Sequence, residues 1–285
     1  MKIAFWNINN NTDLADVLID FVKENDIEIL LLAESQKSKK NKRGCTVDDI
    51  LLDFITKSKS KLTFDFNIIP NDDFRVKVIS SLDPNIFFLK NTLFKSSRWS
   101  AFHIVIPGII KLNLFPVHFY SKVNWSESSL ALECVNFSRD ISLVEKDTNC
   151  TNSILIGDFN MSPFEHGVVA SNGIHALQDL NYLASETAGR EIDGIFYKYF
   201  YNPMWNFLGD KSTPYGTIYH RVSGHISHEW HIYDQVILRP ELKNHITKKS
   251  TKIITEIAGQ SILKKYDRPD EKYSDHLPIT IKLEI

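Results

Sequence analysis

The sequence lacks a strong net charge. Its 33 lysines and arginines are balanced by 35 aspartates and glutamates, so the formal net charge is -2. A protein that holds nucleic acid through a global positive field carries a large basic excess, and this class is therefore disfavoured. The near-neutral charge does not exclude an enzyme that neutralises phosphate with a bound metal ion.

Cysteines and long apolar runs are also scarce. Cys45, Cys134 and Cys150 are an odd number without the spacing of a metal site, so we expect no disulfide framework and a reducing, cytoplasmic compartment. No apolar run approaches the roughly 18 residues that span a bilayer. The first six residues are typical of a strand rather than of a signal peptide. We therefore predict no membrane partner.

What remains is the composition of an ordinary folded protein, with 43% hydrophobic and 24% charged residues. On length alone, 285 residues allow one large domain or two small ones. Hydrophobic periodicity predicts apolar strands and amphipathic helices along the chain. The strands are expected at 3–6, 27–32, 101–106, 109–117 and 277–283, and a long helix is expected at 126–146.

The stretch 153–160, S-I-L-I-G-D-F-N, is the most informative. Its apolar run at 154–156 is typical of a strand buried on both faces. Asp158 and Asn160 follow two positions apart, so in an extended segment both side chains point to the same side. This pattern predicts a catalytic edge, although an Asx-turn between a strand and a helix is the alternative.

A helix is expected to begin directly after this stretch. Ser162 is a suitable N-cap, Pro163 fits the first helical position, and Glu165 completes a capping box. The polar residues would then be held between a strand and a helix, as a rigid catalytic site requires.

Other predicted strands also end in polar residues that packing does not explain. Glu34 follows the apolar run I-L-L-L-A, and a buried, unpaired carboxylate is costly. Glu34 is therefore either exposed or bound to a cation, and we favour the cation. Asn7 and His118 end two further strands; a lone histidine is more often structural, but His118 is one of several polar residues at such ends.

Asp234 lies within an apolar stretch, W-H-I-Y-D-Q-V-I-L, predicted to be one strand over 230–238. A carboxylate inside a core strand needs a partner. The segment Ser274-Asp275-His276 offers one, directly before the last strand.

Basic and aromatic residues add three further candidates for substrate contact. Lys39, Lys40 and Arg43 belong to a basic loop at 37–43, which is either a solvated loop or a flap that contacts phosphate. Arg98 could also reach phosphate, or be an ordinary surface residue. The aromatic-rich region at about 175–229 either packs onto the body or stacks bases.

Together and in this order, these features resemble the endonuclease/exonuclease/phosphatase superfamily, the DNase-I-like metal-dependent phosphoesterases. The most specific parts are G-D-F-N at 157–160 and S-D-H at 274–276, and the resemblance extends from W-N-I-N at 6–9 to the C-terminal strand. It implies one domain over residues 1–285 with an α/β (α+β) four-layer sandwich fold. Two packed, mostly antiparallel sheets would be flanked by helices, with strand ends converging at one end. The region 175–229 matches no motif and is expected to be an irregular insertion.

The resemblance also implies a metal site. Glu34 resembles the principal ligand of Mg²⁺, with Mn²⁺ as an alternative, and Asn7 and Asp275 resemble assisting ligands. Oxygen ligands of this kind suit a hard divalent cation. The chain departs from one branch of the family at Asn9, where some abasic-site nucleases have an aspartate, which leaves one ligand open.

Catalytic roles follow from the same resemblance. Asp234 looks like the carboxylate that holds His276 in the correct tautomer, so that the pair activates or orients the attacking water. Asp158 resembles the group that positions the nucleophile or protonates the leaving oxygen. Asn160 and His118 would donate hydrogen bonds to phosphoryl oxygens.

The expected function is therefore divalent-metal-dependent hydrolysis of a phosphodiester, with DNA or RNA as the expected substrate. The alternative is a phosphatase or phosphodiesterase for a small molecule or a lipid headgroup. A third hypothesis, a binding module that has lost catalysis, is opposed by the full set of candidate catalytic residues.

Overall fold

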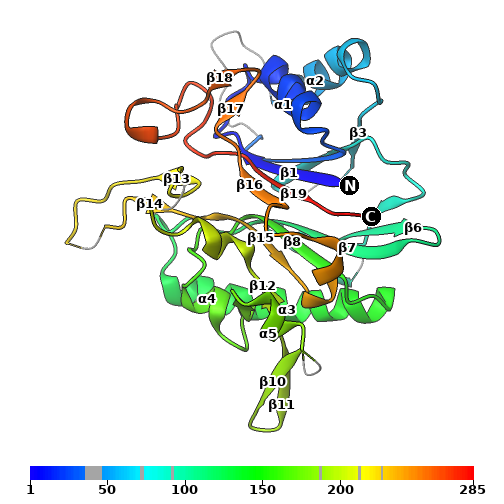
Figure 1. Ribbon diagram of the computed structural model, residues 1–285, viewed down its shortest axis with the longest axis vertical. Coiled ribbons are helices and arrows are strands. Elements are labelled where there is room, and N and C mark those ends of the chain that lie inside the picture. The colour runs from blue at the N-terminus through cyan, green and yellow to red at the C-terminus, as the bar shows by residue number, and fades with distance from the viewer. Residues whose placement is uncertain (36–46, 71–73, 91–92, 186–187, 211–212, 226) are drawn as a thin grey trace.

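The computed structural model describes residues 1–35, 47–70, 74–90, 93–185, 188–210, 213–225 and 227–285. Two β-sheets face each other, and helices cover the outer face of each sheet, which gives four layers (Figure 1). The sandwich expected from the sequence is present. Among these residues no helix combines the length and the apolar character needed to cross a membrane.

The first sheet has six strands and carries both ends of the chain (Figure 1). In spatial order its strands are β16 (Thr251–Ile253), β19 (Ile279–Lys282), β1 (Lys2–Asn7), β2 (Ile29–Ala33), β4 (Val76–Ser80) and β3 (Asn67–Ile69). Among the described strands of this sheet, β1 and β2 pair in parallel and the other pairs are antiparallel. Helix α1 (Ala15–Asn25) makes the crossover that a parallel pair requires, and α1 and α2 (Val47–Lys61) cover the outer face.

The second sheet has seven strands. In spatial order they are β5 (Phe87–Leu89), β6 (Phe102–Ile106), β7 (Ile110–His118), β8 (Ser153–Asp158), β15 (Asp234–Leu238), β12 (Phe200–Tyr201) and β9 (Ala176–Leu177). The pairs β7–β8 and β9–β12 are parallel and the others antiparallel. The long helix α3 (Glu127–Thr148) connects β7 to β8 and covers the outer face together with α4 (His166–Val169) and α5 (Leu180–Leu183) (Figure 1).

Short elements complete the fold. They are the ribbons β10 (Gly189–Ile192) with β11 (Ile195–Lys198), β13 (Ile218–Tyr219) with β14 (Trp230–His231), and β17 (Glu256–Ile257) with β18 (Gln260–Ser261), and the 3-10 helices η2 (Pro203–Phe207), η3 (Pro240–His245) and η4 (Lys265–Asp267).

Apolar side chains fill the space between the layers. One cluster lies between the two sheets and beneath α1 and α2, and a second lies beneath α3. On α3 the residues that the sequence spaces three or four apart are all buried: Leu130, Cys134, Phe137, Ile141 and Val144. The helical periodicity therefore predicted correctly which face of α3 packs on the sheet.

The parallel pairs decide where the polar strand ends meet. Asn7 lies opposite Ala33 in the β1–β2 pair, so Glu34 follows at the same edge. His118 lies opposite Asp158 in the β7–β8 pair, and Asp234 lies opposite Asp158 in the antiparallel β8–β15 pair. Because β1 and β2 also pack against β8, these ends gather at one end of the sandwich.

Gly157 allows β7 and β8 to approach closely just before their polar ends. Its φ is +152°, and a Cβ atom built on it would lie 2.0 Å from the carbonyl oxygen of Val117. We expect Gly157→Ala to lower the free energy of unfolding by about 3 kcal/mol, because the two strand backbones must separate. Chemical denaturation measures this loss. Gly224→Ala is the control, since nothing lies within 4 Å of its added Cβ; equal midpoints for the two variants would contradict the explanation.

Two local predictions from the sequence are wrong. The helix expected at Ser162 begins only at His166, because Glu165 has extended backbone angles and the four residues before the helix form a turn. One of the two hydrogen bonds of the predicted capping box forms, since the Ser162 N–H donates to Glu165 Oε1 at 2.7 Å.

The strand expected over 230–238 is divided into β14 and β15. The chain changes partner between them, since β14 pairs with β13 and β15 pairs with β8. Asp234 is therefore the first residue of β15 and not its middle. The region 175–229 is also more regular than expected, because it contributes β9 and β12 to the second sheet.

Candidate active site

The ends of β1 and β2 place an amide beside a carboxylate. Asn7 Nδ2 lies 3.1 Å from Glu34 Oε1 and 3.3 Å from Asp158 Oδ2, so one amide joins the ends of both sheets. Glu34 turns the chain out of β2 with φ +49°, and 34% of its side chain is exposed. Asn10 Nδ2 lies 3.3 Å from its other oxygen. Glu34 is therefore fixed from two sides but remains open to solvent.

Asp158 is buried where β8 ends. Its Oδ1 accepts the backbone N–H of Asn160 at 2.8 Å, which is the Asx-turn that the sequence left open as an alternative. The Asn160 amide nitrogen donates to the carbonyl of Phe119 at 3.1 Å. Burial, and next the charge of Asp234, raises the pKa of Asp158. The Asx-turn is therefore present, but it does not explain why Asn7 and His118, from other strands, lie against the Asp158 carboxylate.

Asp234 and His276 form the pair that the sequence predicted. Asp234 Oδ2 lies 2.8 Å from His276 Nδ1, and both side chains are buried. Burial alone would lower the pKa of His276, but the carboxylates of Asp234, Asp158 and Asp275 outweigh it and raise the pKa to about 10. One ligand atom from each of Asp158, Asp234 and His276 lies within 4.8 Å of the other two. Since Asp234 and His276 already bind each other, we interpret this cluster as an Asp–His pair that faces a third acid.

His118 stands between the carboxylates of the two sheets. Its Nε2 lies 3.7 Å from Glu34 Oε1 and 3.8 Å from Asp158 Oδ2. Burial lowers the pKa of His118 to about 4 despite the nearby Asp158, so the ring is neutral at neutral pH. Its Nδ1 is buried and has no hydrogen-bond partner among the described residues.

The segment 274–276 is attached to β1. Ser274 Oγ donates to the carbonyl of Asn7 at 2.7 Å, and Trp6 Nε1 donates to the carbonyl of His276 at 2.9 Å. Asp275 is less buried than its neighbours and lies 3.4 Å from Ser274 Oγ. These bonds explain why the C-terminal histidine lies beside residues near the N-terminus.

The residues around Glu34 fit a hard divalent cation. Glu34 and Asp158 both lie against the Asn7 amide and the neutral His118, and within the described ranges neither makes an ion pair with lysine or arginine. Two carboxylates so close together repel, and a cation with oxygen ligands relieves this repulsion. Asn7 presents its nitrogen to Glu34 in this structure, so its amide must turn over before the oxygen can serve as a ligand.

Comparisons with known proteins identify the fold. No family model matches the chain, and no curated protein matches its sequence. Among solved structures, an endonuclease/exonuclease/phosphatase family protein from Leptotrichia buccalis matches with a TM-score of 0.54 at 16% identity, over 100% of both chains. The human Nocturnin catalytic domain with bound sulfate matches with 0.54 at 13%, over 99% of this chain and 93% of that one. D. rerio TDP2 complexed with a single-strand DNA product matches with 0.53 at 14%, over 100% and 99%.

The chain therefore has the fold of the endonuclease/exonuclease/phosphatase superfamily, and the fold predicted from its sequence motifs is confirmed.

The structure places most of the predicted site residues together, with some exceptions. Lys39, Lys40 and Arg43 lie outside the described residues. Arg98 lies beside the end of β7, because its carbonyl accepts the N–H of His118 at 2.8 Å. Asn10, which contacts Glu34, was missed by the sequence analysis. The run N-I-N-N-N after Trp6 was the available signal, since its asparagines continue the polar end of β1.

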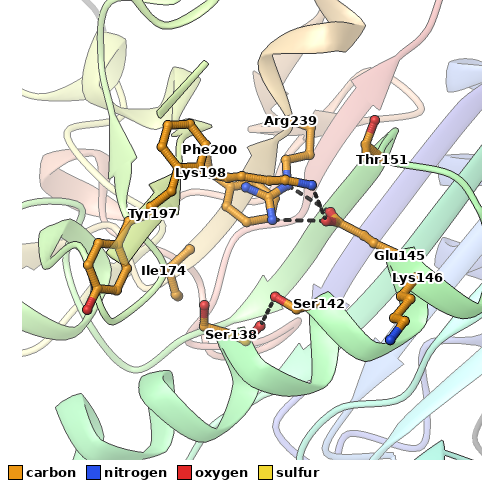
Figure 2. A pocket seen from close by; sticks show the side chains of 11 residues that line it. Ser138, Ser142, Glu145, Lys146, Thr151, Ile174, Tyr197, Lys198, Phe200 and Arg239 are labelled. Atoms are coloured by element: carbon orange, nitrogen blue, oxygen red, sulfur yellow. Dashed lines mark hydrogen bonds and ion pairs between the residues drawn. The ribbon is translucent and has the colours of Figure 1, made fainter. Parts of the chain in front are cut away.

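A cavity of about 390 Å³ lies away from this site, between α3 and the segment from β11 to β12 (Figure 2). At its base Arg239 Nε lies 2.8 Å from Glu145 Oε1, and Lys198 reaches the same carboxylate at 3.6 Å. The Arg239 N–H donates to the carbonyl of Ser153, at the opposite end of β8 from Asp158. This cavity thus contributes no side chain to the candidate active site.

Proposed function

We propose that the protein is a divalent-metal-dependent phosphoester hydrolase and that it acts as a nuclease on DNA or RNA. The observation that carries the proposal is the meeting of an Asp234–His276 pair with the carboxylates of Glu34 and Asp158 at one end of the sandwich. Neighbours of the same fold support it, since one is a TDP2 structure with a single-strand DNA product and another is Nocturnin with a bound sulfate anion.

Glu34 would hold the cation, Mg²⁺ or Mn²⁺, with Asn7 and Asp275 as the further ligands that the motifs suggest. When bound, such an ion supplies Lewis-acid stabilisation of negative charge on phosphoryl oxygens. Glu34 suits this role because its carboxylate remains open to solvent, unlike those of Asp158 and Asp234.

The Asp234–His276 pair controls one proton. Asp234 accepts the Nδ1–H of His276, which fixes the tautomer and leaves Nε2 for the substrate or the attacking water. With its raised pKa the ring holds a proton at neutral pH and donates to a phosphoryl oxygen. If Glu34 held a cation, that charge would oppose the imidazolium and favour the neutral His276 ring, whose Nε2 would then accept a proton from the attacking water.

Asp158, His118 and Asn160 act on the other side of the phosphoryl group. The raised pKa of Asp158 suits a group that hands a proton to the leaving oxygen, and its ionised form would position the nucleophile. Neutral His118 and the second amide hydrogen of Asn160 are available to donate to phosphoryl oxygens as negative charge develops.

A small-molecule or lipid-headgroup phosphoester is the second candidate substrate. The net charge of -2 favours it, because no global positive field attracts a polyanion. Hydrolysis should be compared on single- and double-stranded DNA, RNA, and chromogenic mono- and diesters, in Mg²⁺ and in EDTA. Metal-dependent cleavage of a polymer supports the nuclease, cleavage of only the small esters supports the second candidate, and cleavage unaffected by EDTA contradicts both.

Glu34→Gln tests the metal site. We expect the Mg²⁺ concentration for half-maximal activity to rise at least about tenfold, because a charged ligand is lost. The midpoint of thermal unfolding should not fall, since removing one charge relieves the repulsion between Glu34 and Asp158. Glu191→Gln on the exposed strand β10 is the matched control. An unchanged Mg²⁺ titration in Glu34→Gln would assign the cation to other ligands.

A further inference from the structure

Arg98 is held in a fixed position beside the active site. Trp99 forms a bridge with Val117, and the His118 N–H donates to the Arg98 carbonyl at 2.8 Å, so the residue is attached to the end of β7. Its guanidinium carbon lies 3.6 Å from the centre of the Tyr120 ring. Tyr120 in turn stacks on Trp125, with 3.7 Å between ring centres and 7° between planes. Three planar groups thus restrict the orientation of the guanidinium.

The positive charge of Arg98 is not neutralised by a neighbouring acid. Its Nε is buried without a hydrogen-bond partner, and it makes no ion pair within the part of the chain that the structure describes. Glu133 acts on it only through its charge. A buried donor without a partner is costly, so a ligand that accepts from it is favoured. Lys122 differs, because its ammonium group is paired with Glu165.

The segment of a second arginine, Arg75, is joined through its backbone to the segment that carries Arg98. The Arg75 N–H donates to the carbonyl of Ser97, and the Arg75 side chain is exposed. The charge of Arg75 contributes to lowering the pKa of the Arg98 guanidinium, and the charges of both arginines contribute to lowering the pKa of His118. Two arginines from segments that share a backbone hydrogen bond therefore direct positive charge at His118, although like charges repel.

We propose that Arg98 and Arg75 form a second phosphate subsite, so that the substrate carries a phosphate group beyond the one that is cleaved. This inference rests on the proposed function and narrows its substrate. A phosphate removes the repulsion between the guanidiniums and accepts from both, in the bidentate geometry that arginine favours. Under the proposed function the cleaved phosphate would have other partners, namely His118, His276 and the cation that Glu34 would hold.

A second phosphate can come from two sources. It is the neighbouring linkage in a polynucleotide, or the other half of a pyrophosphate in a small molecule. An ester with only one phosphate, such as a phospholipid headgroup, does not fill the subsite. The subsite thus distinguishes between the substrate classes that the catalytic residues alone leave open.

The test compares thymidylyl-thymidine, which has one phosphate, with its 5′-phosphorylated form, which has two, and includes ADP-ribose as the pyrophosphate. We expect wild-type kcat/KM to be about 10- to 100-fold higher for the two-phosphate dinucleotide, as expected for charge-assisted hydrogen bonds. Arg98→Gln and Arg75→Gln should each reduce this preference about tenfold. Arg75 is exposed, so its replacement keeps the test valid if Arg98→Gln fails to fold. Arg190→Gln on the β10–β11 ribbon, which projects beyond α3 (Figure 1), is the matched control.

Binding in EDTA separates this inference from the proposed function. Fluorescence anisotropy should show that the wild type binds a labelled two-phosphate dinucleotide more tightly than the one-phosphate form, and that Arg75→Gln reduces this difference about tenfold. That result supports the subsite even if no substrate is cleaved. Equal affinities together with equal kcat/KM values for the two dinucleotides would overturn the subsite. If both dinucleotides were nevertheless hydrolysed, the proposed function would remain intact. Faster cleavage of ADP-ribose than of the two-phosphate dinucleotide would assign the second phosphate to a pyrophosphate.

Discussion

His276→Ala is expected to lower kcat/KM for phosphodiester hydrolysis by about 10²- to 10⁴-fold, the usual contribution of a positioned acid or base. Among the described side chains, the His276 imidazole is the only hydrogen-bond partner of Asp234 Oδ2, at 2.8 Å. The imidazole also lies in one cluster with Asp158, so it is placed to take up or release a proton there. Alanine removes the group that carries the proton beside Asp158.

The same substitution affects stability, because Asp234 is fully buried. Leaving its carboxylate without the histidine costs roughly 3–5 kcal/mol if it stays ionised. His276→Asn is therefore measured in parallel, since the asparagine amide can still donate toward Asp234 while carrying no titratable proton. Both variants should show a similar loss of turnover, but His276→Asn should unfold at a higher denaturant concentration. Turnover near that of the wild type in either folded variant would refute the role of His276.

Asp158→Asn is expected to reduce turnover by a similar factor, about 10²- to 10⁴-fold, without loss of stability. The amide has the size of the carboxylate but neither takes up nor releases the proton. It also removes the repulsion from Asp234, which lies directly opposite on β15, and that repulsion is one cause of the raised pKa of Asp158. Steady-state kinetics and the denaturation midpoint are the two measurements.

Asp193→Asn provides a matched control, because Asp193 is exposed in the turn between β10 and β11 at φ +50°. Its turnover should equal that of the wild type. If Asp158→Asn kept wild-type turnover, or lost turnover only in proportion to a loss of folded protein, Asp158 would be a structural residue of the Asx-turn and no more.

The sequence indicated candidate site residues where a polar side chain stands in or after an apolar run. A carboxylate after an apolar run, as at Glu34 or Asp158, has a cost that requires a cation, a partner or exposure. The same reasoning applied to Asp234 indicated a partner in S-D-H, and the structure shows that pair. The long helix between β7 and β8 provides the crossover connection that their parallel pairing needs.

Other features depend on contacts between distant segments and have no local signature. The orientation of the Asn7 amide is decided by Glu34 and Asp158 on two different strands. The division of 230–238 depends on which strand each half pairs with. The segments of Arg75 and Arg98 meet through the hydrogen bond from the Arg75 N–H to the carbonyl of Ser97, and nothing in the sequence marks this contact.

The most direct test of the central claim is the hydrolysis of a phosphodiester by the purified wild-type protein in Mg²⁺, with EDTA and His276→Asn as parallel samples. We predict cleavage that EDTA abolishes, that added Mg²⁺ restores, and that falls by about 10²- to 10⁴-fold in the folded variant. Cleavage that persists in EDTA, or that is equal in the wild type and the variant, would show that the strand-end site does not perform the reaction.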